Sequence, residues 1–323
     1  MSDIALHPPI SLPDARVPWL MGLVMLAGLA SVAAPLLTYS LTLAVFGLPH
    51  VIQEMRYLRA RFDKALGPVF WAVIALLAVV AMSRFAAFMD VLSYPTMRGI
   101  ELGTGAVLVA VVAPQWWPRG GVARWTGLAL TLGLVGGLLL APIPTMLLVA
   151  VGHNWTPVPL LMDTRPSRTW VVLAALAFAV LPLLIATGLP WHGLTLLGLT
   201  HAELDVVTGG MLHQQYAAYL PRSWHTAAWI QHAFSAIVFA QCAHYIAVLG
   251  VMPAVKDGPE RVMPARRWIA STIAILSLGL LCLYIIDFRA SRELYGVFSS
   301  MHAWVEIPII LLLLHNTKSP QLW

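Results

Sequence analysis

Apolar segments long enough to cross a lipid bilayer follow one another along almost the whole chain. A transmembrane helix needs roughly 17–25 mostly apolar residues. Backbone polar groups must be paired within lipid, so such segments are expected to be helices. The expected spans are 18–48, 68–88, 99–117, 124–151, 169–188, 193–216, 226–250, 268–288 and 293–316.

Composition leads to the same fold class. Apolar residues make up 59% of the 323 positions, charged residues only 10%, and the mean hydropathy is +0.81. Soluble domains carry about 25% charged residues. We therefore predict an all-α protein, a polytopic transmembrane helical bundle with about eight to ten spans. Residues 1–17 are expected to form a short N-terminal tail and 18–318 a single integral membrane domain.

Prolines divide two of the expected spans. Pro35 lies inside the over-long first segment, and Pro142 and Pro144 lie inside the fourth. Proline removes a helical hydrogen bond and clashes with the preceding turn. We expect the first segment to split into two helices and the fourth to break into a helix and a re-entrant piece.

The net charge of +5 does not indicate a nucleic-acid partner, because the basic residues lie in short clusters beside the expected spans. Such clusters are typical of cytoplasmic loops that face anionic lipid. We expect the lipid bilayer to be the partner and the inner (cytoplasmic) membrane of a bacterium to be the location. The clusters are Arg56, Arg59, Arg61 and Lys64; Arg119 and Arg124; and Lys256, Arg261, Arg266 and Arg267.

Three segments within apolar sequence repeat one arrangement of a histidine and an acid. "HVIQE" contains His50 and Glu54, "HAELD" contains His201 and Asp205, and "HAWVE" contains His302 and Glu306. Residues four apart lie on one helical face, about 5–6 Å apart between Cβ atoms. Charged groups inside a membrane are costly and are usually paired or functional. We predict that these histidines bind a metal and that Glu54, Asp205 and Glu306 act as ligands or as catalytic groups that orient the imidazoles.

Three further histidines are candidate ligands. His244, late in an apolar helix, is included in the predicted metal set. His232 lies twelve residues earlier, about 120° away around a straight helix, and is a weaker member. His153, in "GHNWTP", needs a re-entrant segment to reach the others. Asp90, Glu101 and Asp287 lie near span ends, where a structural role is expected.

The types of candidate ligand narrow the choice of metal ion. Imidazole and carboxylate ligands without a cysteine cluster favour iron, with manganese, zinc or copper as alternatives. Such a site inside lipid suits the oxidation of a lipophilic substrate by O2. The sequence therefore predicts a non-haem iron oxygenase or other oxidoreductase with one or two ions; it does not identify an electron donor.

Two other functions fit the same residues. The histidine–acid pairs would also serve as a relay in a transporter coupled to protons or metal ions. Two of the histidines would also serve as axial ligands in a bis-His haem protein, although haem ligation does not need the carboxylates.

Four short segments resemble one known family. "FGLPH" at 46–50, "THAELD" at 200–205, "AQCAHY" at 240–245 and "SMHAWVE" at 300–306 are similar to segments of the Brp/Blh-type membrane β-carotene 15,15'-dioxygenases. Proteins of that family are polytopic helical enzymes thought to hold iron with histidines and to cleave a carotenoid to retinal. The resemblance implies a membrane non-haem metal oxygenase with His50, His201 or His153, and His244 as ligands.

Overall fold

The computed structural model describes residues 16–67, 69–112, 121–162, 166–200, 227–252 and 265–316. Every secondary-structure element in these ranges is helical, which confirms the predicted all-α class. Five of the described helices are long and apolar enough to cross a membrane: Pro35–Tyr57, Val69–Phe88, Tyr94–Val112, Arg168–Ala186 and Trp229–Val251. The chain is therefore an integral membrane protein. Val17–Ala33, Leu128–Leu140 and Ala274–Ile286 are shorter apolar helices, and about eight to ten crossings stays a prediction.

The chain divides into two compact units. Unit 1 comprises the described residues of 54–163 and 282–323, and unit 2 comprises those of 7–53 and 164–281. Helix α2 (Pro35–Leu66) runs through the division, so its first part belongs to unit 2 and its second part to unit 1. Most of the expected N-terminal tail lies outside the described residues.

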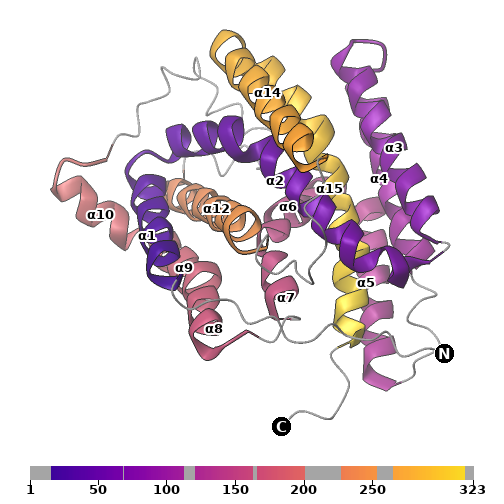
Figure 1. The fold of residues 1–323 in the computed structure, drawn as a ribbon, viewed down its shortest axis with the longest axis horizontal. Helices are drawn as coiled ribbons and strands as arrows, with labels where there is room; N and C mark the ends of the chain where they lie inside the picture. The colour runs from indigo at the N-terminus through magenta and orange to yellow at the C-terminus, as the bar shows by residue number, and fades with distance from the viewer. Residues whose placement is uncertain are drawn as a thin grey trace. The chain divides into compact units, whose positions relative to one another are not determined.

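Three helices of unit 1 pack side by side, namely α3 (Val69–Phe88), α4 (Tyr94–Val112) and α15 (Phe288–Asn316) (Figure 1). A short turn connects α3 to α4. Asp90 adopts a left-handed conformation there, with φ 56°, as a residue just after a helix end often does. The hydroxyl of Ser93 accepts a hydrogen bond from the Thr96 N–H at 3.3 Å and so caps the start of α4.

The fourth expected span breaks where its prolines predict. A single residue separates helix α5 (Gly121–Leu140) from helix α6 (Pro142–Gly152). Ala141 between them has φ −140° and ψ 64°, outside the helical region. A Cβ at Gly137 would lie 2.6 Å from the Thr145 hydroxyl, so only glycine leaves room for α6 against α5 at this point. The other predicted break is also confirmed, since α1 (Val17–Ala33) ends just before α2 starts at Pro35.

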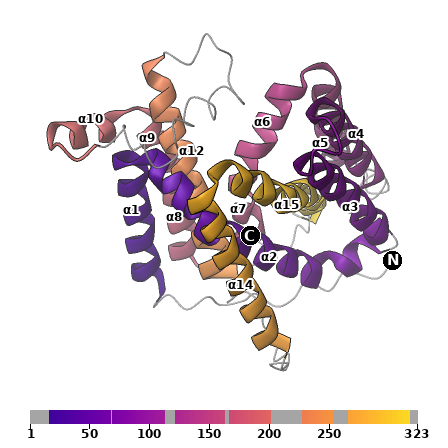
Figure 2. The same cartoon turned by 90° about the horizontal axis from the view of Figure 1, so that it is seen from above.

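Helix α12 (Ala228–Ile246) is the centre of unit 2. It packs against α1 and α9 (Leu181–Ala186), and α1 also contacts α8 (Arg168–Ala175) and α10 (Leu189–Leu196) (Figure 2). A Cβ at Gly28 of α1 would lie 3.6 Å from the Phe239 ring, an ordinary van der Waals contact, so α1 and α12 are closely packed at this point. Phe239 is completely buried.

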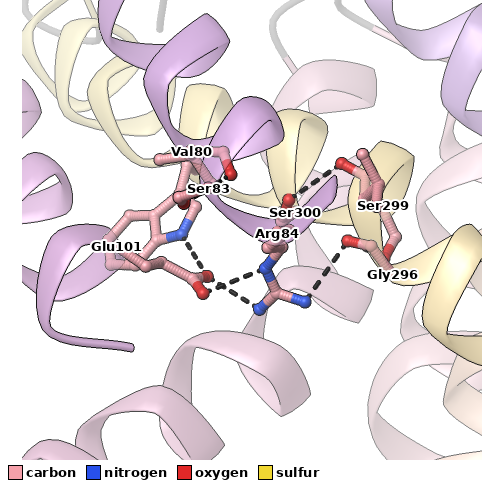
Figure 3. Close-up of polar contacts among 9 residues, drawn as sticks. Val80, Ser83, Arg84, Glu101, Gly296, Ser299 and Ser300 are labelled. Carbon is pink, nitrogen blue, oxygen red and sulfur yellow. Dashed lines mark hydrogen bonds and ion pairs between the residues drawn. The ribbon is translucent and has the colours of Figure 1, made fainter. Parts of the chain in front are cut away.

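An ion pair with a buried carboxylate connects the three packed helices of unit 1 (Figure 3). Arg84 of α3 donates from Nε and Nη2 to the two carboxylate oxygens of Glu101 on α4, at 2.9 and 2.8 Å. The indole Nε1 of Trp304 on α15 donates to Glu101 Oε1 at 2.9 Å. Arg84 Nη1 donates to the carbonyl oxygen of Gly296, also on α15, at 3.3 Å. We call Arg84, Glu101 and Trp304 the brace.

Replacing Arg84 with methionine is expected to destabilise the protein markedly. Glu101 is only 1% exposed, and the substitution removes two charge-assisted hydrogen bonds from its carboxylate. A buried charged group that loses its partner costs about 2 kcal/mol or more. Thermal unfolding in detergent should show a clear fall in the midpoint.

A matched arginine provides the control for this substitution. Arg289 donates to Glu293 at 2.9 Å on α15, but their side chains are 66% and 30% exposed. Exposed pairs contribute little to stability, so Arg289→Met should leave the midpoint nearly unchanged. Equal shifts of the unfolding midpoint in the two variants would show that burial of the Glu101 carboxylate contributes nothing to stability.

Candidate metal centre

Helix α15 presents a histidine and a carboxylate to the interior of unit 1. His302 and Glu306 are each only 1% exposed. They are four residues apart in a continuous helix, so both side chains project from the same face. This is the arrangement expected from "HAWVE". The helix thus places one nitrogen and one oxygen ligand close together in an apolar setting.

The helix break after α5 brings His153 to the same place. His153 begins a 3₁₀ turn, His153–Trp155, directly after α6. Its Nδ1 lies 3.6 Å from Glu306 Oε2, and its ring centroid lies 5.1 Å from that of His302 with the planes at 83°. Ligand atoms of His153, His302 and Glu306 all lie within 4.8 Å of one another. The helix break therefore brings His153 to His302 and Glu306, and a re-entrant path through the membrane stays a prediction.

Glu54 is the fourth member of this group in unit 1. It lies in the second part of α2 and is completely buried. One of its oxygens is within 4.8 Å of a ring nitrogen of His302, and its carboxyl group is a close neighbour of that of Glu306. We call Glu54, His153, His302 and Glu306 the four-ligand cluster.

The four-ligand cluster fits a divalent transition metal. Metal–ligand bonds to histidine and carboxylate are about 2.0–2.2 Å, so two ligands of one ion lie up to roughly 4.4 Å apart. The ligand atoms of His153, His302 and Glu306 lie within 4.8 Å of one another, so only small side-chain movements would bring them to that value. Two carboxylates buried side by side are costly without a cation, and a divalent ion would neutralise them. His153, His302 and Glu306 also supply the two histidines and one carboxylate that are typical of non-haem iron(II) sites.

A hydroxyl group supports the cluster. Thr156 is 2% exposed, and its Oγ1 donates to the carbonyl oxygen of His153 at 2.8 Å. The same side chain is a close neighbour of the Glu306 carboxyl group. Thr156 therefore contacts both the turn that carries one ligand and the carboxylate of another. Thr156 is not among the residues predicted from the sequence, and its place three residues after His153 is the sequence feature that points to it.

We expect Thr156→Val to weaken metal binding without unfolding the protein. The substitution keeps the branched shape but removes the hydroxyl near Glu306, and the loss of such an outer contact costs about 10–100-fold in affinity. Isothermal titration of the metal-free protein with Co²⁺ would measure the change. Thr156→Ser keeps the hydroxyl and should bind almost as the parent does; a Ser variant as weak as the Val variant would contradict this role.

Unit 2 holds two buried histidines, His50 and His244. Their ring centroids lie 5.2 Å apart at 86°, and they have ligand nitrogens within 4.8 Å of each other. Two further contacts join α2 to α12: the rings of Tyr39 and Phe234 are 5.9 Å apart, and Gln241 Nε2 donates to Thr42 Oγ1 at 3.3 Å.

The tautomer of His50 suits ligation. Its Nδ1 lies 3.1 Å from the carbonyl oxygen of Phe46. A carbonyl oxygen only accepts, so Nδ1 carries the proton and Nε2 keeps its lone pair in the neutral ring. The ring of Tyr245 lies 4.2 Å from that of His50 at 37° and supports it from one side.

The remaining predicted ligands have different outcomes. His201 and Asp205 lie outside the described residues, so their roles stay predictions. The structure does not bring His232 to the His50–His244 pair. Its ring instead lies 5.8 Å from His192 and 6.2 Å from Trp191. The physical reason is the twelve-residue separation from His244 on α12, which is about 18 Å along the axis.

Comparison with known proteins gives no independent assignment. No family model matches the chain, and neither a curated protein nor a solved structure matches it. The buried histidines and carboxylates are therefore the basis for assigning a function.

Proposed function

We propose that this protein is a membrane-embedded, metal-dependent oxidoreductase, an oxygenase that uses non-haem iron on a lipophilic substrate. The observation that carries the proposal is the four-ligand cluster, with its two imidazoles and two carboxylates in one compact unit. Manganese, zinc or copper would suit the same residues. Iron is favoured because two histidines and one carboxylate leave coordination positions free for O2 and substrate.

The burial of the cluster supports a lipophilic substrate. His302, Glu306 and Glu54 are at most 1% exposed, and their unit consists largely of apolar helices. An apolar molecule dissolved in the bilayer would enter such a unit without losing hydration. The resemblance to the Brp/Blh-type family leads to the same class, a long apolar chain or polyene oxidised by O2.

Within this proposal each side chain has a defined task. Bound iron would supply the activation of O2. His302 and His153 hold the metal through neutral imidazole nitrogens, while Glu306 and Glu54 balance its charge. Thr156 fixes the turn that carries His153. The apolar surroundings keep bulk water from the reacting carbon atoms.

The reaction type sets the electron balance. Cleavage of a carbon–carbon double bond with both atoms of O2 retained yields two carbonyl groups and needs no external reductant. Hydroxylation retains one oxygen atom, reduces the other to water and needs two electrons and two protons from a donor. The ratio of O2 consumed to reductant consumed therefore distinguishes the two reactions.

The test is oxygen consumption by protein in nanodiscs that has been stripped of metal and reloaded with Fe²⁺. We expect O2 uptake with a mixture of polyene and isoprenoid lipids, ¹⁸O from ¹⁸O2 in the products, and neither result with His302→Ala. Uptake that is the same in the variant and the parent would overturn the proposal. An intense Soret band in the purified parent would instead indicate haem, and substrate flux that survives metal removal would indicate a transporter.

A further inference from the structure

The brace lies on the side of α15 opposite the cluster residues. Trp304 is two residues after His302 and two before Glu306 in a continuous helix. Two residues correspond to about 200° of rotation, so the indole points away from both ligands. Trp304 Nε1 donates to Glu101, whereas His302 and Glu306 point toward His153. Residues 302–306 of α15 are thus held by the brace on one side and by the four-ligand cluster on the other.

From this geometry we infer that the brace is a positioning assembly, which sets the rotation of α15 so that His302 and Glu306 meet the other metal ligands. The inference rests on the proposed metal site. It assigns Arg84, Glu101 and Trp304 to the function of the cluster, although none of them touches it. They are positioning residues that act through α15.

The brace fixes the rotation of α15 about its axis as well as its contact with α3 and α4. Apolar helices in lipid can rotate against one another at small cost, because no hydrophobic difference separates their faces. The bond from Trp304 Nε1 to Glu101 Oε1, at 2.9 Å, has one donor and one acceptor and so permits a single orientation of the indole. The paired bonds from Arg84 hold the Glu101 carboxylate at a fixed angle. Rotation of α15 would break these bonds at the same time as it displaced the two ligands.

Glycine provides the space for the brace. A Cβ at Gly105 of α4 would overlap the Trp304 ring. The indole therefore lies directly against the α4 backbone. The Arg84 guanidinium lies directly against α15, since a Cβ at Gly296 would be 3.3 Å from Arg84 Nη1. Two glycines thus let the polar groups reach across the helix interfaces.

Two pairs of variants test the inference. Trp304→Phe keeps a ring but removes the N–H donor, and Trp71→Phe is its control because Trp71 is 72% exposed on α3 of the same unit. Gly105→Ala displaces the indole, and Gly103→Ala is its control because a Cβ at Gly103 has no neighbour within 4 Å. Each purified, metal-free protein would be titrated with Co²⁺, with the visible absorption spectrum recorded alongside thermal unfolding.

We expect Trp304→Phe and Gly105→Ala to bind Co²⁺ about 10- to 100-fold more weakly than the parent, in line with the loss of a group that orients a ligand. Their Co²⁺ bands should shift, since the angles between ligands change. Both controls should match the parent in affinity and spectrum.

The outcomes separate the two proposals. A lower unfolding midpoint with the affinity and spectrum of the parent would show that the brace is merely structural, and would overturn this inference while the proposed metal site stands. A parent protein that binds no Co²⁺, Fe²⁺, Mn²⁺ or Zn²⁺ would overturn both.

Discussion

Replacing His302 with alanine is expected to abolish metal binding while the protein stays folded. Within the four-ligand cluster, His302 has ligand nitrogens within 4.8 Å of ligand atoms of His153 and of Glu54. Its loss leaves only one imidazole in the cluster. Because the loss of an outer contact alone costs about 10–100-fold in affinity, the loss of a ligand should cost more than about 100-fold. Isothermal titration calorimetry with Co²⁺ would measure this loss of affinity.

Another histidine provides the control for His302→Ala. His192 is exposed on α10 and belongs to neither group of candidate ligands. His192→Ala should therefore keep the affinity and stoichiometry of the parent. If His302→Ala bound the metal as tightly as His192→Ala does, the cluster would not be the metal site.

Replacing Glu306 with glutamine is expected to change stability in opposite directions with and without metal. The carboxyl groups of Glu306 and Glu54 lie against each other in a buried site. Without a cation this arrangement is costly, so the metal-free variant should be more stable than the metal-free parent, by on the order of 1 kcal/mol. With metal the order reverses, because a ligand present at 100 times its Kd stabilises the parent by about 2.7 kcal/mol and the variant loses this gain.

Thermal unfolding of the parent and of Glu306→Gln, with chelator and with saturating metal, would show whether the order of their stabilities reverses. Glu293→Gln is the matched control, since Glu293 lies on the same helix but is 30% exposed and pairs with Arg289. It should shift neither form appreciably. A Glu306→Gln protein that is less stable than the parent under both conditions would mean that Glu306 is a structural residue.

The sequence was sufficient to predict those features that depend on local helix geometry. The all-α class follows from the length of the apolar segments, and the breaks at Pro35 and Pro142 follow from proline chemistry. His302 and Glu306 share a face because they are four residues apart on one helix. These predictions need no knowledge of how distant segments pack.

Features that depend on tertiary packing could not be predicted in the same way. His153 reaches His302 only because Ala141 leaves the helical region and α6 folds back against Gly137. Glu101 was expected near a span end in a structural role, yet it is buried and pairs with residues on two other helices. Neither contact leaves a periodic pattern in the sequence, because the partners come from segments that only the folded unit brings together.

Metal content is the most direct test of the central claim that the buried imidazoles and carboxylates hold a metal. The measurement is elemental analysis of the full chain, purified in detergent without chelator and without an affinity tag that binds metal. We predict that Fe, Mn, Zn or Cu is present in a stoichiometric amount and that it is lost in His302→Ala and in Glu306→Gln. Metal-free parent protein that stays folded and takes up none of these ions on titration would contradict the account.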